Sequence, residues 1–385
     1  MKPKAAVISL YYGSYNYGGV LQAYAMNRLL EQRGVQAEQL LYRKTKTAAS
    51  RAQSLRSKRL SHLAKRSAEK MRTRVTDALA DQEELALRRE AFDRFKEQYI
   101  RQSDRVYSDE DIAETVPCYD IFVAGSDQIW KHSSVTGTYL LDFVPAEKRK
   151  FSYAASVAVA IPDSCGERYR SAVPKLDGAS VRERSAQAML RDICGCDVEW
   201  VLDPVMTLTP SDWESVIAAP VIEGPYLFCY FLGEDRALRS FAKRYAKRCG
   251  LKLVTLPFAG PEHSFSDFTF GDERLYAAGP AEYLSLIRNA ACVLTDSFHA
   301  AAFSILFQRP FWVLDRSAFR GADLRVTDLL STFGLQERLL SVEGDPLSEA
   351  MHAPTLDFSE VQERLRTERK RSLAYLDRLV TLRTV

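Results

Sequence analysis

Several features that would assign a function at once are missing from this chain. No apolar run reaches the length needed to cross a bilayer, and Met1-Lys-Pro-Lys leads directly into a strand-like run instead of a signal-peptide core. We therefore expect a cytoplasmic protein. The seven cysteines are scattered, and their one close pair, Cys194 and Cys196, is spaced C-x-C rather than C-x-x-C. This spacing favours reduced, mostly buried thiols and no zinc or other metal site.

Strong net charge and the usual nucleotide-binding signatures are missing as well. A formal net charge of +3 over 385 residues is too small to indicate nucleic-acid binding. The N-terminal glycines Gly13, Gly18 and Gly19 are not spaced as G-x-G-x-x-G, and no Gly-Lys-Ser/Thr ending follows them, so no nucleotide cofactor is implied. With 46% hydrophobic residues, the chain is nevertheless long enough to bury the cores of two domains.

The pattern that is present alternates buried strands with amphipathic helices. It begins with a strand at 5–10, a turn rich in glycine and tyrosine, and a helix at 20–30. A strand at 198–202, which Asp203-Pro204 breaks, ends the first half, and the alternation resumes with a strand at 226–232. Such alternation predicts the α/β class, with parallel sheets and helical crossovers. We expect two Rossmann-like, doubly wound domains facing a cleft, in a GT-B-like arrangement. The expected divisions are a first domain at 1–205 with a basic helical insertion at about 43–99, a second domain at 206–350, and a C-terminal helical segment at 351–385. The helix of this last segment is expected to run from about Ser359, as its N-cap, to Leu382 and to pack back on the first domain.

Candidate site residues fall where strands end, because open α/β sheets bind ligands at the carboxyl edge of their strands. The stretch Val293-Leu-Thr-Asp-Ser-Phe-His299 predicts a strand, a tight turn and a helix start, which places His299 at that edge. Histidine changes protonation near neutral pH, and helix starts favour anions. The alternative is a histidine that caps a helix or packs at a domain interface. Gly18 and Gly19 likewise permit close backbone approach at a helix start, although a glycine turn without a ligand is the commoner outcome.

Three further candidates follow two other predicted strands. Asp127 lies in the loop after the strand at 120–125, where it serves either the reaction or only the loop as a cap. Arg182 and Arg184 follow one another at period two at the end of the strand 179–184, so both are expected on one face of the cleft. Arg184 is equally consistent with a surface salt bridge.

A basic segment interrupts the first domain. Between Arg43 and Arg74 there are twelve Lys or Arg residues and one acidic residue, Glu69. Apolar residues at helical spacing predict a long amphipathic helix through this segment to Tyr99. A solvated helix face is the simpler interpretation, and peripheral contact with an anionic membrane or glycan is the functional one.

Three ordered motifs give the chain a resemblance to a known family. Tyr17-Gly-Gly-Val-Leu-Gln-Ala-Tyr24, Gly125-Ser-Asp-Gln-Ile-Trp130 and Thr295-Asp-Ser-Phe-His299 resemble those of the polysaccharide pyruvyl transferases, over most of the chain. The resemblance implies a GT-B-like fold and no cofactor. It also implies transfer of a pyruvyl group from phosphoenolpyruvate to a sugar or lipid-linked glycan, with formation of a ketal.

The resemblance also implies roles for the candidates. His299 and Asp127 would transfer protons, and Arg182, Arg184, Gly18, Gly19 and Ser297 would bind substrate. The family often has Arg two residues before the histidine and Gly directly after it, whereas this chain has Ser297 and Ala300. Two other classes stay open: a GT-B glycosyltransferase using a nucleotide sugar, and a non-catalytic protein that binds a glycan or a lipid surface.

Overall fold

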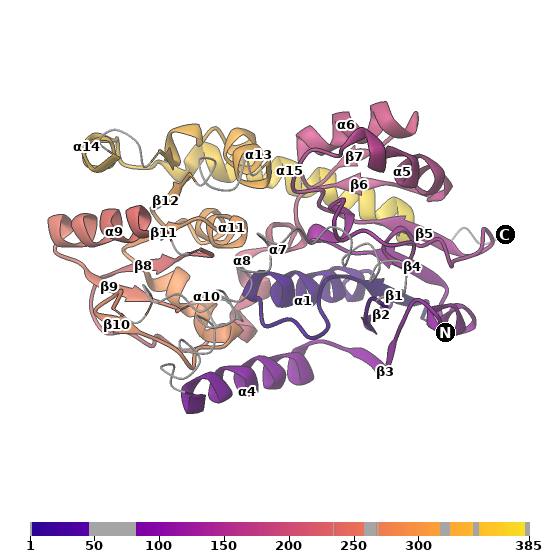
Figure 1. Ribbon diagram of the computed structural model, residues 1–385, viewed down its shortest axis with the longest axis horizontal. Helices are drawn as coiled ribbons and strands as arrows, with labels where there is room; N and C mark the ends of the chain where they lie inside the picture. Colours follow the sequence, from indigo (N-terminus) through magenta and orange to yellow (C-terminus); the bar gives the residue numbers. More distant parts are fainter. Residues whose placement is uncertain are drawn as a thin grey trace, which may run out of the picture.

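A computed structural model describes residues 2–45, 82–233, 235–257, 267, 269–315, 324–341 and 346–381. These residues form two α/β lobes joined side by side (Figure 1), with the N-terminal half coloured indigo to magenta and the C-terminal half orange to yellow. Each lobe is built on a parallel sheet with helices against it. The predicted segment 43–74 lies almost entirely outside the described residues.

The sheet of the N-terminal lobe has, within the described residues, five parallel strands in the order β3-β2-β1-β4-β5. The strands are β1 (Lys4–Ile8), β2 (Gln36–Tyr42), β3 (Gln102–Tyr107), β4 (Ile121–Ala124) and β5 (Arg149–Ser152). A short parallel pair, β6 (Ser180–Val181) and β7 (Glu199–Trp200), continues this layer beyond β5 through single bridges such as Ala155 with Val181.

The sheet of the C-terminal lobe has, in the described part of the chain, six parallel strands in the order β10-β9-β8-β11-β12-β13. The strands are β8 (Tyr226–Tyr230), β9 (Lys252–Thr255), β10 (Glu273–Arg274), β11 (Cys292–Thr295), β12 (Phe311–Leu314) and β13 (Leu339–Leu340). In both sheets the chain order reverses beside the first strand, which is the point where open α/β sheets bind ligands.

Helices cover both faces of each sheet. They are α1 (Tyr17–Glu31), α4 (Gln82–Tyr99), α5 (Gly166–Ala172), α6 (Arg184–Cys194), α7 (Pro204–Thr207), α8 (Pro210–Trp213), α9 (Arg236–Cys249), α10 (Pro280–Asn289), α11 (Phe298–Leu306), α13 (Leu324–Phe333), α14 (Pro346–His352) and α15 (Phe358–Val380). Burial follows the period of two: Ala5 and Val7 of β1 join one hydrophobic cluster, whereas Ala6 and Ile8 join another on the opposite face.

The two lobes share one of these clusters. It contains Val7 of β1 and Phe228 of β8 together with residues of α1, α10, α11 and α15. The stacked rings of Tyr17 and Tyr283, with centroids 4.5 Å apart, lie within it, and the Tyr17 hydroxyl donates to the carbonyl of Ala278 at 2.7 Å. The lobes are therefore held together by a continuous core that includes the start of α1.

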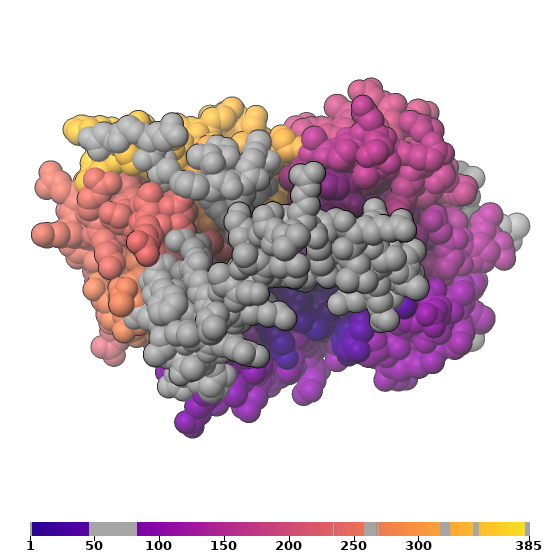
Figure 2. Space-filling view, in the orientation of Figure 1, coloured from indigo at the N-terminus to yellow at the C-terminus, as the bar shows by residue number. Residues whose placement is uncertain are grey.

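Two long helices reinforce this junction. From α15, the Tyr375 hydroxyl donates to the Ser152 carbonyl at 2.8 Å, and the Ser372 hydroxyl accepts from the Leu202 amide at the same distance. From α4, the buried Arg88 donates to the carbonyls of Pro257 at 2.7 Å and Leu275 at 2.9 Å in the other lobe. In Figure 1, α4 runs along the bottom from the N-terminal lobe to beneath α10. In Figure 2, the indigo N-terminal residues reach the surface just above α4.

Three local expectations require correction. The cap of α15 is Asp357, whose carboxylate accepts the Ser359 amide at 2.9 Å, so Ser359 lies inside the first turn. The segment 198–202 forms only the two-residue strand β7. All seven cysteines are free thiols. We expected most of them to be buried, but only three are.

Candidate functional site

Strand ends from both lobes converge on one buried polar cluster. It is formed by residues within four positions after the ends of β4, β6, β7 and β11, and all of them are buried except Asp127, which is partly exposed: Ser126, Asp127, Arg182, Glu183, Asp203 and His299. The first turns of α1 and α11 close the cluster, because His299 of α11 lies directly against Gly18 of α1. Every parallel strand delivers its carboxyl end to the same edge of its sheet, and this geometry brings together residues that are far apart in sequence.

His299 is the second residue of α11, and only 6% of its surface is exposed. Its Nε2 has no hydrogen-bond partner and lies 3.8 Å from Oδ2 of Asp203. The pKa of His299 is lowered to about 4, mainly by burial and to a lesser extent by the nearby Arg182, while Asp203 and Asp127 act in the opposite direction. The imidazole is therefore neutral at pH 7, and it can accept a proton.

Arg182 lies at the centre of the cluster. Its NH1 donates to Oδ2 of Asp203 at 2.6 Å, its NH2 lies 3.4 Å from Oδ1 of Asp127, and its Nε lies 3.6 Å from Oε1 of Glu183. The ring of Phe298 covers the guanidinium at 4.3 Å. One buried cation thus contacts three carboxylates, and a buried arginine needs such partners. Its charge is already satisfied within the protein.

Asp203 is one of three members of the cluster that the sequence did not indicate, together with Ser126 and Glu183. Its side chain is completely buried and caps α7, with Oδ1 accepting the Val205 amide at 3.0 Å, while the Ser126 hydroxyl donates to Oδ2 at 2.8 Å. Burial acts to raise the pKa of Asp203, but Arg182 and His299 hold it below its usual value. Asp followed by Pro is a typical helix start, so the dipeptide Asp203-Pro204 was the available signal.

Asp127 has a strained backbone at the edge of the cluster. Its φ of 68° lies in the left-handed region, which is uncommon for a residue other than glycine. Parallel pairing with Ala155 holds this conformation, together with the bond from the Ser156 amide to the Asp127 carbonyl at 2.9 Å. The side chain is 13% exposed. Asp127 is thus the more accessible carboxylate beside Arg182.

The other predicted site residues divide into two groups. Gly19 lies near Asp127, since a Cβ on Gly19 would be 3.7 Å from the Asp127 carboxylate. Ser297 is buried at the cap position of α11 and makes no side-chain capping bond. The structure brings both residues to the cluster, as it does His299, Asp127, Arg182 and Gly18.

Arg184 belongs elsewhere. It stacks on Trp200 at 3.9 Å and pairs with Glu368 of α15 at 3.0 Å, and it is 44% exposed. The strand β6 ends at Val181 and α6 begins at Arg184, so the alternation expected for a strand does not extend to these arginines. The surface salt bridge that we considered for Arg184 is the contact that the structure contains.

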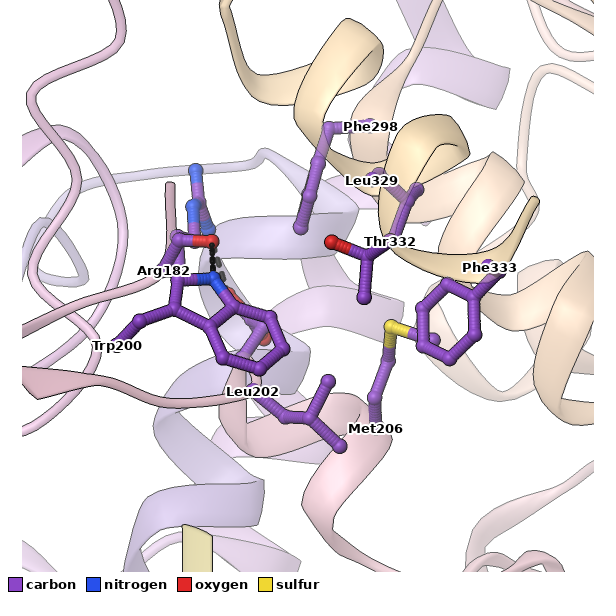
Figure 3. Close-up of a pocket in the computed structure, with 9 residues that line it drawn as sticks. Arg182, Trp200, Leu202, Met206, Phe298, Leu329, Thr332 and Phe333 are labelled. Carbon is purple, nitrogen blue, oxygen red and sulfur yellow. Dashed lines mark hydrogen bonds and ion pairs between the residues drawn. The ribbon is translucent and has the colours of Figure 1, made fainter. Parts of the chain in front are cut away.

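A small pocket lies beside Arg182 and Trp200 (Figure 3). Its wall is mostly apolar and is formed by residues of both lobes, with Arg182 and Asp203 as its charged members. The other lining residues are Trp200, Leu202, Met206, Phe298, Leu329, Thr332 and Phe333. The Trp200 indole donates to the Arg182 carbonyl at 3.0 Å, as the dashed line in Figure 3 shows.

The described residues contain no group of three or more His, Cys, Asp or Glu side chains arranged to hold a metal ion. None of the helices in this part of the chain combines the length and apolar composition that a bilayer crossing demands. The cluster itself can exchange protons, because it places a neutral imidazole beside ionised carboxylates.

Comparison with known proteins adds a family to this geometry. The UDP-N-acetylglucosamine 2-epimerase from Methanocaldococcus jannaschii shares the fold with a TM-score of 0.53 at 11% identity, over 97% of this chain and 99% of that chain. The putative UDP-N-acetylglucosamine 2-epimerase from Listeria monocytogenes gives 0.51 at 12% identity, over 99% and 94%. These similarities show the GT-B-like fold alone. Comparison with curated proteins finds no match.

The family model described as polysaccharide pyruvyl transferase matches residues 16–317, a range that contains both helix starts and the whole polar cluster. The chain therefore belongs to the polysaccharide pyruvyl transferase family, whose members are transferases that act on glycans.

Proposed function

We propose that this protein transfers a pyruvyl group from phosphoenolpyruvate to two hydroxyls of one sugar in a polysaccharide or glycan precursor, forming a cyclic ketal and releasing phosphate. The observation that carries the proposal is His299, a neutral and buried imidazole without a hydrogen-bond partner on Nε2, at a helix start where two lobes meet. The proposal needs no nucleotide sugar and no cofactor.

The reaction requires proton transfer at two places. Carbon 3 of phosphoenolpyruvate gains a proton and becomes a methyl group, while one sugar oxygen bonds to carbon 2. Phosphate then leaves carbon 2 with the electron pair of its bond, and the second sugar oxygen takes its place. The first hydroxyl proton balances the proton gained by carbon 3, and the second departs with phosphate. A neutral imidazole accepts a hydroxyl proton and, once charged, returns it, so His299 serves both directions of transfer.

The remaining candidates receive roles that follow from their contacts. Asp127, the more accessible carboxylate, orients or deprotonates the second acceptor hydroxyl. We expected Arg182 to bind the donor anion, but three carboxylates already surround its guanidinium, so it fixes the geometry of those carboxylates instead. The anionic groups of the donor then fall to first-turn amides of α1 and α11, with Gly18, Gly19 and the Ser297 hydroxyl beside them. The Gly19 amide is not among these donors, because it already donates to Oδ1 of Asn16 at 2.9 Å.

A screen of sugar acceptors with phosphoenolpyruvate tests the proposal, read by phosphate release and by the mass of the product. Once an acceptor is found, His299→Ala should reduce turnover by about two to four orders of magnitude, the range for loss of a general acid or base, and should change the donor KM much less. Near wild-type turnover in this variant refutes the role of His299. Transfer from a nucleotide sugar instead identifies a glycosyltransferase, and glycan binding without turnover identifies a binding protein.

A further inference from the structure

We propose that Asp203 is a positioning residue of this site: its carboxylate, fixed by the N-terminal lobe, orients the imidazole of His299 across the junction of the lobes and stabilises positive charge on that ring. This inference rests on the proposed function only for its consequence on turnover. Its structural part concerns two side chains that can be observed without substrate.

Asp203 is held from several directions. Oδ1 accepts the Val205 amide at 3.0 Å, and Oδ2 accepts from the Ser126 hydroxyl at 2.8 Å and from Arg182 at 2.6 Å. The side chain has no exposed surface. A carboxylate with three donors in a buried setting cannot change rotamer without leaving polar atoms unpaired, so its position is rigid.

The oxygen of Asp203 that faces His299 is Oδ2. Oδ2 lies 3.8 Å from His299 Nε2, just beyond hydrogen-bond distance, and the described residues provide no hydrogen-bond partner for that nitrogen. A carboxylate opposite a ring nitrogen favours the tautomer that carries its proton there. We therefore expect the neutral ring to be protonated on Nε2, leaving Nδ1, the atom packed against Gly18, as the basic nitrogen.

The charges around His299 also give Asp203 this role. The charged groups that act on His299 come from four elements: Asp203 caps α7, Arg182 follows β6, Asp127 follows β4, and Arg325 lies near the start of α13. Asp203 is the carboxylate with the largest effect, and it favours the protonated ring. Because burial disfavours that charge, a nearby carboxylate is needed when the ring takes a proton during transfer. Asp127 is the weaker of the two carboxylates acting on the ring.

Asp203→Asn is the decisive substitution. Asparagine has one acceptor oxygen, and if that oxygen keeps the cap on Val205, the amide NH2 replaces Oδ2 and turns a donor toward His299. The substitution should shift the neutral ring toward the tautomer protonated on Nδ1. It should also lower the pKa of His299 by about 1 to 3 units, the usual effect of one opposite charge at this range.

Nitrogen-15 NMR of histidine-labelled protein measures both effects, because the two ring nitrogens give separate shifts for the protonated and unprotonated states. The chain has five histidines, and His299→Ala assigns the signal. Asp357→Asn is the matched control, since Asp357 caps α15 through the same type of bond to the amide two residues ahead but lies exposed in another helix. If Asp203→Asn fails to fold, Asp203→Ser keeps a capping oxygen and removes the same charge.

The proposal holds if wild-type His299 is protonated on Nε2 and if the tautomer shift and the lower titration midpoint occur in Asp203→Asn but not in the control. It is overturned if the wild-type ring is protonated on Nδ1, or if the variant retains the wild-type tautomer and midpoint. With an acceptor in hand, kcat should fall about tenfold or more with KM changed less. Absence of pyruvyl transfer by the wild type, with the NMR result intact, defeats the proposed function and leaves the positioning role of Asp203 in place.

Discussion

Gly18→Ala provides the sharpest test of the site geometry. A methyl group on Gly18 would lie 1.9 Å from Nδ1 and 2.4 Å from Cγ of His299, whereas ordinary contacts begin at about 3.4 Å. The imidazole must therefore move by about 1.5 Å, or α1 and α11 must separate by a similar amount. Alanine favours the helix by up to about 1 kcal/mol over glycine, while overpacking a buried site costs about 1 to 3 kcal/mol, so the fold should survive with a small net loss.

Activity should respond much more than stability. A misplacement of about 1 Å in a catalytic group can reduce turnover by about 10²-fold, which corresponds to about 2.7 kcal/mol in the barrier. We expect a loss of at least this size in phosphate release from phosphoenolpyruvate with the accepted sugar, alongside a melting temperature within a few degrees of wild type.

Gly166→Ala is the control for this experiment. Gly166 is also buried in the first turn of a helix, but a Cβ there would meet its nearest neighbour at 3.6 Å, an ordinary contact. The control should retain both turnover and stability. Wild-type turnover in Gly18→Ala would show that the packing of His299 against α1 has no part in the chemistry, and the assignment of the site would fail with it.

Two other predictions concern pH and the basic segment. His299 has a pKa of about 4 in the folded protein and 6.5 in the unfolded chain, so the unfolded chain binds the proton first as the pH falls. Above pH 6.5 this group does not reduce the free energy of unfolding. Between pH 6.5 and pH 4 it reduces the free energy of unfolding by up to about 3 kcal/mol, and below pH 4 it causes no further loss. Chemical denaturation should therefore show a steeper decline for the wild type than for His299→Gln between pH 6.5 and 4, and parallel curves would contradict the burial argument. For residues 43–74, we propose contact with an anionic membrane, to which each basic residue near the surface contributes about 1 kcal/mol. Sedimentation at low salt should then pellet the protein with anionic vesicles but not with neutral ones. Equal, negligible pelleting with both kinds of vesicle would contradict membrane contact.

The fold was accessible from sequence wherever a strand is buried on both faces. β1, β4, β8 and β11 are short apolar runs, and each was predicted within a few residues. β2 and β3 were not predicted. Gln39 in β2 is polar but fully buried, and it hydrogen-bonds to Ser9 and Asn27. β3 is an edge strand in which only one of six residues is buried. Hydrophobic periodicity cannot detect a strand of either kind.

The site was only partly accessible for a related reason. Position at a strand end indicated His299, Asp127 and Arg182, and the structure brings these three together. Asp203 was interpreted only as a break after a strand, because its role depends on partners such as Ser126, which is 77 residues away. Arg184 was assigned to the cleft by an alternation that ends at Val181. Local patterns locate the edge of a sheet, but they do not determine which side chains meet across it.

The junction of the lobes decides how the cluster can work. Proteins with two Rossmann-like domains often close around substrate by a hinge between the domains. Here the stacked pair Tyr17 and Tyr283 and the contacts of α4 and α15 join the lobes within the same core that carries the start of α1. His299 and Asp203 therefore approach one another across a packed junction, where large rigid-body motion would break buried contacts. Small adjustments are sufficient: shortening the 3.8 Å separation by about 1 Å produces a hydrogen bond of ordinary length. In the reaction that we propose, a preorganised cluster of this kind would lower the barrier by having its dipoles and charges already in place when charge develops.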